Sequence, residues 1–198
     1  MSDAGGKALP EEVVEQAKLH TLDTVGAMVS GSSLRPGKFA IAFARSYGGE
    51  PVATVVASRV ACGPLEAALA NAVLAHSDET DDSNAPSVSH PGASIVPATL
   101  AVGERFDIDG ARFLRAVTLG YDVGARMTIT LGPHAFSAEG HKSTHSVAAT
   151  FGSAADAGCA AGPTVQQMRW LLDYAAQQSS GITASADPSR RRLTPWSC

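Results

Sequence analysis

Helix-length runs of small apolar residues, opened by proline and closed by glycine, dominate this sequence. Pro10, Pro64 and Pro91 each open such a run, and Gly31 and Gly162 each close one. Proline fits the first helical turn because its missing N–H has no partner to lose there, and glycine ends helices readily. Apolar residues make up 44% of the chain and aromatic residues only 6%. We therefore predict an all-α fold of closely packed helices.

The predicted helices span approximately residues 10–31, 36–47, 64–76, 91–103, 109–130, 144–161 and 164–181. Asp109 is expected to cap one of them, and Thr164 with Gln167 is expected to form a capping box. Gly120 and Gly124 lie four positions apart on one helix, where they remove side-chain bulk. This spacing predicts a close crossing by a neighbouring helix.

Two segments depart from the helical pattern. Residues 52–60 are apolar and β-branched without a helical period, so the all-α fold is expected to hold at most one or two short strands there. Residues 131–142 contain proline, glycine and histidine and are predicted to be a loop. Two of the predicted helices are expected to bury a face that carries larger side chains, namely Phe39, Phe43, Leu65 and Leu69.

The composition predicts one domain and a tail. Residues 1–182 are expected to form a single helical domain. Residues 183–198 cluster arginine, proline and serine without a period, which predicts an irregular tail, either disordered or frame-shifted. The cysteines are odd in number and lack a metal-binding spacing, so we expect reduced thiols at Cys62, Cys159 and Cys198.

Charge and hydropathy argue against several classes of partner. The net charge of -4 leaves no basic surface for nucleic acid or for an anionic membrane. The first residues lack the apolar stretch of a signal peptide, and no apolar run reaches the length of a membrane span. We expect a cytoplasmic protein that binds neither nucleic acid nor membrane.

The most polar segment follows the helix predicted to end at His76, which is expected to lie at a buried end. Four carboxylates, Asp78, Glu79, Asp81 and Asp82, fall within five positions, and a loop then leads to His90. Functional side chains are commonly placed on loops between buried helices. A solvated acidic loop explains the same composition, so the segment alone leaves both interpretations open.

A second histidine-bearing stretch runs from Gly140 to Ser146, where another helix begins, and it contains His141 and His145. Helix N-termini expose unpaired N–H groups and favour anions. His90 also directly precedes a helix. If the two helix starts converge, they form a pocket for a small carboxylate, with imidazoles as acid or base near neutral pH.

Other chemistries were weighed for the same residues. Imidazole and carboxylate are acceptable ligands for a divalent metal, and the candidates are His76, Asp78, Asp81, Asp82 and His90. No zinc or EF-hand spacing is present, so we expect neither a metal nor another cofactor. Hydrolytic chemistry lacks a Gly-x-Ser-x-Gly element. A capping or hydrogen-bonding role for each histidine stays open.

Four ordered motifs resemble the MmgE/PrpD family, and together they cover about residues 10–182. The first is an Ala-rich helix that ends in His76, followed by an acidic run and by Ser89-His90-Pro91-Gly92. The other three lie at residues 120–126, 143–155 and 174–181. The family includes 2-methylcitrate dehydratase and related decarboxylases and epimerases of small acids.

The resemblance implies a helical domain, cofactor-free lyase or isomerase chemistry on a small di- or tricarboxylate, and a homodimer. It places His90, Glu79 and Asp82 among the catalytic residues, although aspartate is more usual at the position of Glu79. The second catalytic histidine matches less directly, because many members place it at the position of Ser143, whereas this chain has His145. The residues expected to contact substrate are His76, Asp78, Asp81, Ser83, Lys142, Ser143 and Thr144.

The acidic run raises an electrostatic objection, because four carboxylates repel a polyanionic substrate unless cations intervene. Only Lys142 is close in sequence. The resemblance implies members more than twice as long, with a lysine-bearing segment and an α+β lid domain, so this chain is expected to be truncated. The alternative function is a catalytically inactive helical fragment that retains only self-association.

Overall fold

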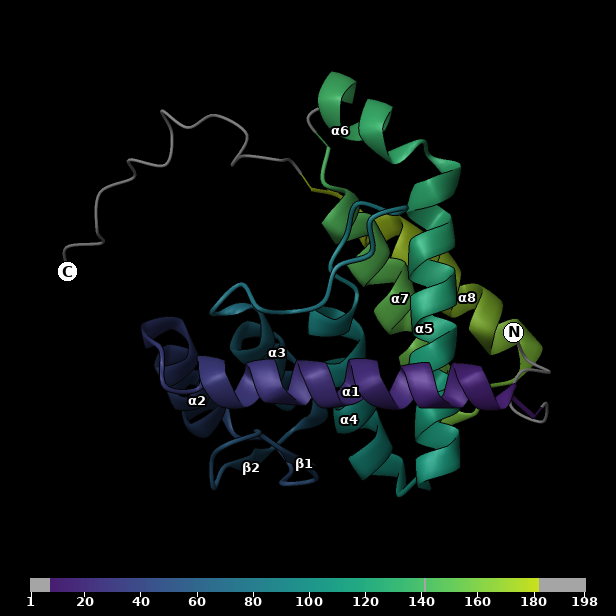
Figure 1. Cartoon of the computed structure of the whole chain (residues 1–198). Coiled ribbons are helices and arrows are strands. Elements are labelled where there is room, and N and C mark those ends of the chain that lie inside the picture. Colours follow the sequence, from purple (N-terminus) through teal and green to yellow (C-terminus); the bar gives the residue numbers. More distant parts are fainter. Residues whose placement is uncertain (1–7, 141, 182–198) are drawn as a thin grey trace, which may run out of the picture.

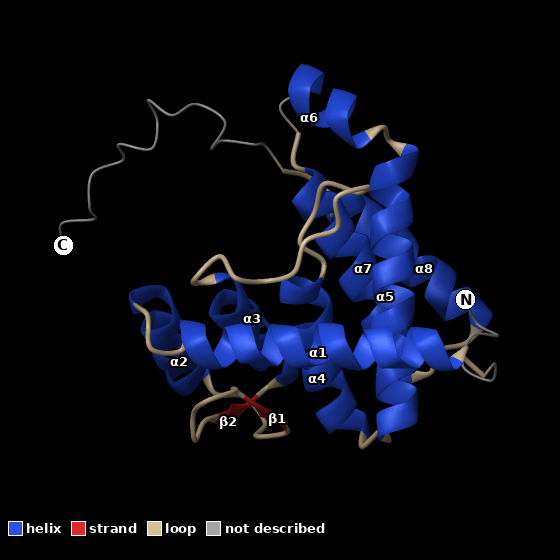
Figure 2. Cartoon of the chain, viewed as in Figure 1, coloured by secondary structure: helices blue, strands red, loops and turns tan. Residues whose placement is uncertain are grey.

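A computed structural model describes residues 8–140 and 142–181. Within these residues the regular secondary structure is almost entirely helical (Figures 1 and 2), which confirms the all-α prediction. The tail predicted for residues 183–198, together with His141 and Cys198, lies outside the described part of the chain. The elements are α1 (Glu11–Gly31), α2 (Arg35–Tyr47), β1 (Ala53–Thr54), β2 (Ala61–Cys62), α3 (Pro64–His76), α4 (Gly92–Phe106), α5 (Gly110–Thr130), α6 (Pro133–Gly140), α7 (Thr144–Ala161) and α8 (Val165–Gln178).

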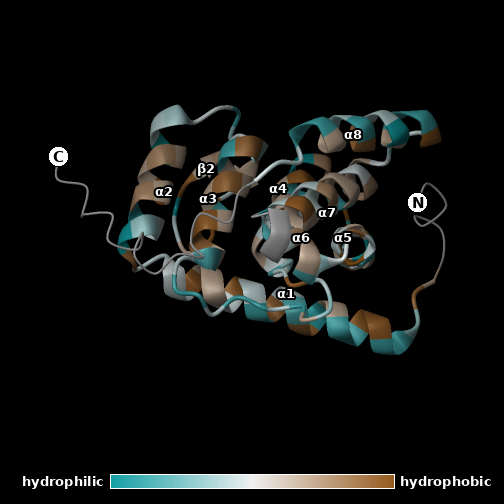
Figure 3. Ribbon diagram, turned by 90° about the horizontal axis from the view of Figure 1, so that it is seen from above, coloured by the Kyte–Doolittle hydropathy of each residue, from teal (hydrophilic) through white to brown (hydrophobic). Residues whose placement is uncertain are grey.

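The helices surround α4, which packs against α1, α3, α5 and α7. Helix α1 runs across α3, α4 and α5, and α2 packs against α3 at the far end of α1 (Figure 1). Seen from above, α8 lies on the side of the bundle opposite α1, where it packs on α7 (Figure 3). The first turns of α4 and α7 therefore approach the C-terminal end of α3.

The main core lies between α3 and α4. Its largest fully buried apolar side chains come from four helices and from the turn between β1 and β2, and each contributes about 1.5–3 kcal/mol through removal from water. They are Met28 on α1, Val55 in the turn, Leu74 on α3, Ile95 and Val96 on α4, and Val117 on α5.

Helices α5 and α7 make the most extensive helix–helix contact, as the glycine spacing predicted. A Cβ atom at Gly124 would lie 2.7 Å from the carbonyl oxygen of Ala148. A Cβ atom at Gly120 would lie 2.8 Å from the Cγ2 atom of Ile95 on α4, so this glycine serves the contact of α5 with α4. Both distances are shorter than real Cβ contacts, so only glycine lets the helices approach this closely.

One or two short strands were expected near residues 52–60, and the structure has two, β1 inside that range and β2 directly after it. β1 pairs with β2 in an antiparallel hairpin, with Ala53 opposite Cys62, and residues between the strands turn back on themselves. The buried Asn71 side chain accepts a hydrogen bond from the Val56 N–H at 2.8 Å and donates to the Thr54 carbonyl at 2.9 Å. These bonds satisfy loop backbone groups and fasten the hairpin to α3.

Three expectations are corrected. Residues 133–140 form α6 where a loop was predicted. The side chains of Phe39, Phe43, Leu65 and Leu69 are exposed, because α2 and α3 bury their smaller residues instead. Close approach explains the choice on α2, since a Cβ atom at Gly37 would lie 2.1 Å from the Gly31 carbonyl oxygen. A bulkier face does not fit there.

The predicted helix caps are confirmed. The Asp109 carboxylate accepts from the Arg112 N–H at 2.7 Å, and Thr164 and Gln167 form the capping box. Cys62 is buried and Cys159 partly buried, and both are free thiols. Among the described residues, no helix combines the length and the apolar character needed to cross a membrane.

Candidate active site

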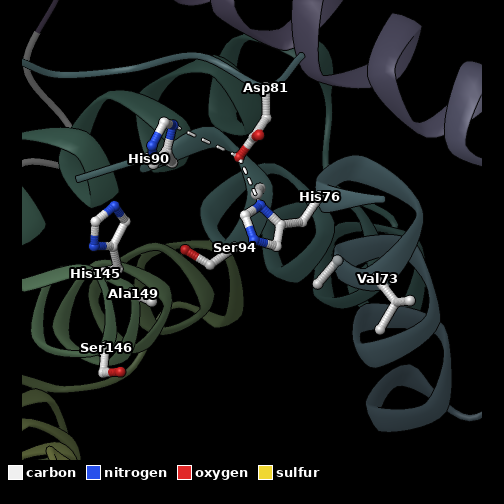
Figure 4. A pocket seen from close by; sticks show the side chains of 10 residues that line it. Val73, His76, Asp81, His90, Ser94, His145, Ser146 and Ala149 are labelled. Carbon is white, nitrogen blue, oxygen red and sulfur yellow. Dashed lines mark hydrogen bonds and ion pairs between the residues drawn. The ribbon is translucent and has the colours of Figure 1, made fainter. Parts of the chain in front are cut away.

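A pocket of about 340 Å³ opens where the C-terminal end of α3 and the following loop meet the first turns of α4 and α7. Its volume lies at the lower end of the range usual for small-molecule sites. Figure 4 shows three histidines and one aspartate directed into the same space. The lining residues are Ala72, Val73, His76, Asp81, His90, Ala93, Ser94, His145, Ser146 and Ala149. The two histidine-bearing stretches thus converge.

His90 precedes α4 and is held by a main-chain contact. Its Nδ1 atom lies 2.7 Å from the carbonyl oxygen of Asp82. A carbonyl only accepts hydrogen bonds, so Nδ1 carries the proton that is donated to it. In the neutral ring the Nε2 atom then holds a free lone pair. This is the tautomer that a general base requires at Nε2.

Asp81 links two of the histidines. Its Oδ2 atom lies 3.3 Å from His76 Nδ1 and 4.0 Å from His90 Nδ1 (dashed lines in Figure 4). The Asp81 side chain is only 2% exposed, whereas that of His76 is 56% exposed. The prediction that His76 lies at a buried end is therefore wrong. The buried carboxylate is therefore placed to pair with either neighbouring imidazole.

His145 is the second residue of α7, and its ring stacks on that of His90 with centroids 5.0 Å apart. Burial lowers the pKa of His145, and the neighbouring His90 and His76 lower it further, against a smaller opposing effect of Asp81 and Glu79. A second positive charge beside His90 is disfavoured. His145 is thus predisposed to the neutral form, and its imidazolium is a stronger acid than an ordinary one.

Asp82 was predicted to be catalytic, but its side chain points away from the lining of the pocket. Its Oδ1 atom accepts from the Gly92 N–H at 2.8 Å, and its Oδ2 atom accepts from the Tyr121 hydroxyl at 2.7 Å. His20 Nδ1 lies 3.3 Å from the same Oδ2 atom. Burial, followed by the negative charge of Asp82, raises the pKa of Tyr121. Asp82 therefore joins the loop to α1, α4 and α5.

The remaining acidic residues and Ser83 also lie outside the lining. Asp78 accepts from the hydroxyls of Ser30 and Thr80, and these bonds lower its pKa. Glu79 is exposed, with its Oε1 atom 3.9 Å from His76 Nε2. Ser83 is exposed. The electrostatic objection is thereby reduced, because the pocket presents three imidazoles and one carboxylate rather than four carboxylates.

The residues expected at the start of α7 serve its structure. The Ser143 hydroxyl caps the helix by accepting from the Ser146 N–H at 3.2 Å. Thr144 is buried and donates its hydroxyl to the Val88 carbonyl at 2.5 Å. The Lys142 ammonium lies over the ring of Phe136, 5.3 Å from its centroid. None of the three lines the pocket.

Sequence reasoning missed four residues at or beside the site. Ser94 and Ser146 line the pocket, and His20 and Tyr121 hold Asp82. Tyr121 belongs to one of the four motifs, so its importance had a signal. His20 lies on α1, far from any histidine-bearing stretch, and had none. Within residues 8–140 and 142–181, no group of three or more His, Cys, Asp or Glu side chains is arranged to hold a metal ion.

Fold and pocket together define a helical domain with an imidazole–carboxylate site. The model of the MmgE/PrpD N-terminal domain matches residues 2–195, and the chain belongs to that family. It is 27% identical over 190 residues to human cis-aconitate decarboxylase, an alignment that covers 93% of this chain. The chain corresponds to 39% of the length of that relative.

Proposed function

We propose that this domain carries the acid–base site of a lyase or isomerase that acts on a small di- or tricarboxylate, by a reaction of the dehydratase or decarboxylase type. The observation that carries the proposal is the convergence of His76, His90 and His145 on one pocket, with His90 held in the tautomer that leaves Nε2 free. Family membership and the printed activity of the human relative support it.

In a dehydration, His90 Nε2 takes a proton from a carbon next to a carboxylate. The electron pair of that C–H bond forms a double bond as the neighbouring C–O bond breaks, and the imidazolium of His145 protonates the departing hydroxyl to give water. The lowered pKa of His145 suits this role, because its imidazolium gives up a proton readily.

In a decarboxylation, the C–C bond to the carboxylate breaks and carbon dioxide leaves. The electron pair stays on carbon, and an imidazolium in the pocket protonates it. Both reactions develop negative charge next to a carboxylate, which a positive imidazole stabilises. His76 is the residue proposed to carry this positive charge and to pair with a substrate carboxylate. Its Nδ1 atom lies 3.3 Å from the Asp81 carboxylate.

The test is proton exchange and turnover on a panel of acids. The full chain is incubated in deuterium oxide with 2-methylcitrate, citrate and cis-aconitate, and exchange, dehydration and decarboxylation are followed by NMR. His90→Gln and His145→Gln are expected to lower the rate at least about 100-fold, the usual contribution of a general acid or base. His134→Gln, on the exposed surface of α6, is the matched control.

A rate in His90→Gln equal to that of the wild type would refute the assignment of His90. Absence of exchange with every acid, together with absence of binding by NMR titration, would refute the proposed function of this chain.

A second candidate is a helical domain that self-associates without turnover, and exposed apolar residues favour it. Leu65 is 80% exposed on α3, and Leu69 follows one turn later on the same face. We propose a homodimer, to be tested by solution mass, with Leu65→Ser and Leu69→Ser as surface variants. A dimer without turnover would favour this candidate. Cytoplasmic location stays a prediction.

A further inference from the structure

We propose that Asp82, Tyr121 and His20 form a positioning cluster that sets the tautomer and orientation of His90. The inference rests on the proposed function only where it treats His90 as the base. It assigns to Asp82 a role that differs from the catalytic one expected from the sequence. It also adds Tyr121 and His20, neither of which lines the pocket.

The side chain of Asp82 collects contacts from three helices. The Gly92 N–H belongs to the first turn of α4, the Tyr121 hydroxyl to α5 and His20 to α1. Both carboxylate oxygens are thereby engaged, and the side chain is only 8% exposed. A carboxylate held by several donors at once has few alternative rotamers, so the backbone of residue 82 is held with it.

The backbone of the same residue governs His90, because the Asp82 carbonyl accepts from His90 Nδ1 at 2.7 Å. Asp82 therefore holds the segment that carries His90 at two points: its carbonyl binds the imidazole, and its carboxylate binds Gly92, two residues further on. A shift of residue 82 would lengthen the hydrogen bond between the Asp82 carbonyl and His90 Nδ1, so the His90 proton could also occupy Nε2. Groups that bind the other nitrogen of a histidine commonly set its tautomer and direction in this way.

Gly92 shows how tightly the cluster is packed. A Cβ atom there would lie 2.5 Å from the Thr24 hydroxyl oxygen, 2.7 Å from Asp82 Oδ1 and 2.8 Å from the Tyr121 hydroxyl oxygen. Any side chain at this position would separate Asp82 from its donors. The requirement for glycine at the first residue of α4 follows from the cluster rather than from the backbone conformation.

His20 and Tyr121 also contact each other, with ring centroids 4.9 Å apart. The carboxylate of Asp82 accepts from the Tyr121 hydroxyl and lies 3.3 Å from His20 Nδ1. Its charge contributes to the raised pKa of Tyr121, which keeps the phenol a donor over the accessible pH range. The titratable groups that face His90 itself are Asp81, His76 and His145. These three groups are left in place by substitutions within the cluster.

The experiment reads the tautomer of His90 directly. Long-range ¹H–¹⁵N spectra of the full chain distinguish a protonated Nδ1 from a protonated Nε2, and His90→Gln assigns the signal. Tyr121→Phe removes only the hydroxyl, His20→Phe keeps the aromatic contact but removes Nδ1, and Tyr174→Phe on the exposed face of α8 is the control.

We expect the Nδ1–H form to dominate in the neutral His90 ring of the wild type and of Tyr174→Phe. In Tyr121→Phe and His20→Phe it should give way to a mixture with the Nε2–H form. With an active acid, these two variants should lose about tenfold in kcat at nearly unchanged KM, as expected when a positioning partner is removed.

If both folded variants kept the wild-type tautomer ratio of His90, the proposed role of the cluster would be refuted, whatever their activity. Loss of the Nδ1–H form in them would support it even if no acid in the panel were turned over, so failure of the proposed function is recognised separately. Circular dichroism checks that each variant is folded, and a variant that unfolds is replaced by Asp82→Asn, which is expected to shift the ratio in the same direction.

Discussion

The imidazole rings of His90 and His145 stack with an interplanar angle of 20°, although one precedes α4 and the other lies in the first turn of α7. Two stacked imidazoles cannot both be charged without a cost, because like charges at this separation repel. The pair therefore favours one protonated and one neutral ring. Burial lowers the pKa of His145 and a charge on His90 lowers it further, so a proton taken up by His90 makes His145 a stronger acid.

We predict that His145 titrates below an ordinary histidine in an NMR pH titration. In His90→Gln the pKa of His145 should rise, because a positive neighbour is removed, but it should stay below the ordinary value since burial is the larger cause. A pKa of His145 that does not respond to His90→Gln would contradict the coupling.

The same shift has a consequence for stability. The folded pKa of His145 lies below its unfolded value, so between the two the unfolded chain binds more protons. The contribution of His145 to stability is therefore fully present above about pH 6.5 and is lost as the pH falls toward the folded value. Urea unfolding at a series of pH values should show a shallower decline below pH 6.5 in His145→Gln.

Asp156 on α7 is predicted to destabilise the fold at neutral and alkaline pH. It is fully buried, and neither carboxylate oxygen has a hydrogen bond of normal geometry. The hydroxyl of the nearby Thr99, which would lower the pKa of Asp156, donates to the Ile95 carbonyl at 2.9 Å. Burial therefore raises the pKa of Asp156 well above its usual value, and the protonated form is favoured in the fold.

Because the folded pKa is the higher one here, stability should fall as the pH rises from about 4 toward the folded value. Asp156→Asn removes this titration and should raise the free energy of unfolding at pH 8, because the buried amide does not ionise. Asp173→Asn on the exposed face of α8 is the matched control. A pH dependence that persists in Asp156→Asn would show that another group causes it.

Glycine substitutions should separate close packing from helix propensity. Gly124→Ala places a Cβ atom 2.7 Å from a backbone oxygen of α7 and should destabilise the fold by about 1–3 kcal/mol. Gly26→Ala on α1 meets nothing within 4 Å and should stabilise it by about 0.5–1 kcal/mol. Thermal and urea unfolding measure both changes. Effects of the same sign would contradict the α5–α7 crossing described above.

Helix positions were predictable because proline, glycine and capping residues act locally. Asp109 and Thr164 mark helix starts through contacts within three residues of themselves. The buried faces were not predictable, because α2 and α3 each carry apolar residues on more than one face and the face that is buried depends on how close a neighbouring helix comes. For that reason the small residues Gly37 and Ala67 are buried, whereas the larger Phe39 and Leu65 are exposed. Periodicity contains no information on that distance.

In the candidate site, too, local features were predictable from the sequence and those that depend on the packing of the helices were not. Composition and motif marked His76, His90 and His145, and the structure gathers them with Asp81. The sequence did not predict that Asp81 lines the pocket while the Asp82 side chain binds Gly92 and Tyr121, because the directions of adjacent loop side chains depend on the fold. The donors to Asp82 come from α1 and α5, so their placement depends on the whole bundle.

The bond between Thr144 and the Val88 carbonyl should govern the stacking of the two histidines, since it joins the start of α7 to the loop that precedes His90. Thr144→Val keeps the shape of the side chain but leaves a buried carbonyl without its donor. We expect a loss of about 1–3 kcal/mol in the free energy of unfolding and a weaker nuclear Overhauser effect between the His90 and His145 rings.

Thr150→Val is the matched control for this change. Its hydroxyl donates to the Ser146 carbonyl within α7, so the substitution removes a bond that stays inside one helix. The contact between the two rings should persist in that variant, and stability should change by less than in Thr144→Val. If both variants kept the ring contact at full strength, the bond from Thr144 to the loop would not be what aligns His145 with His90.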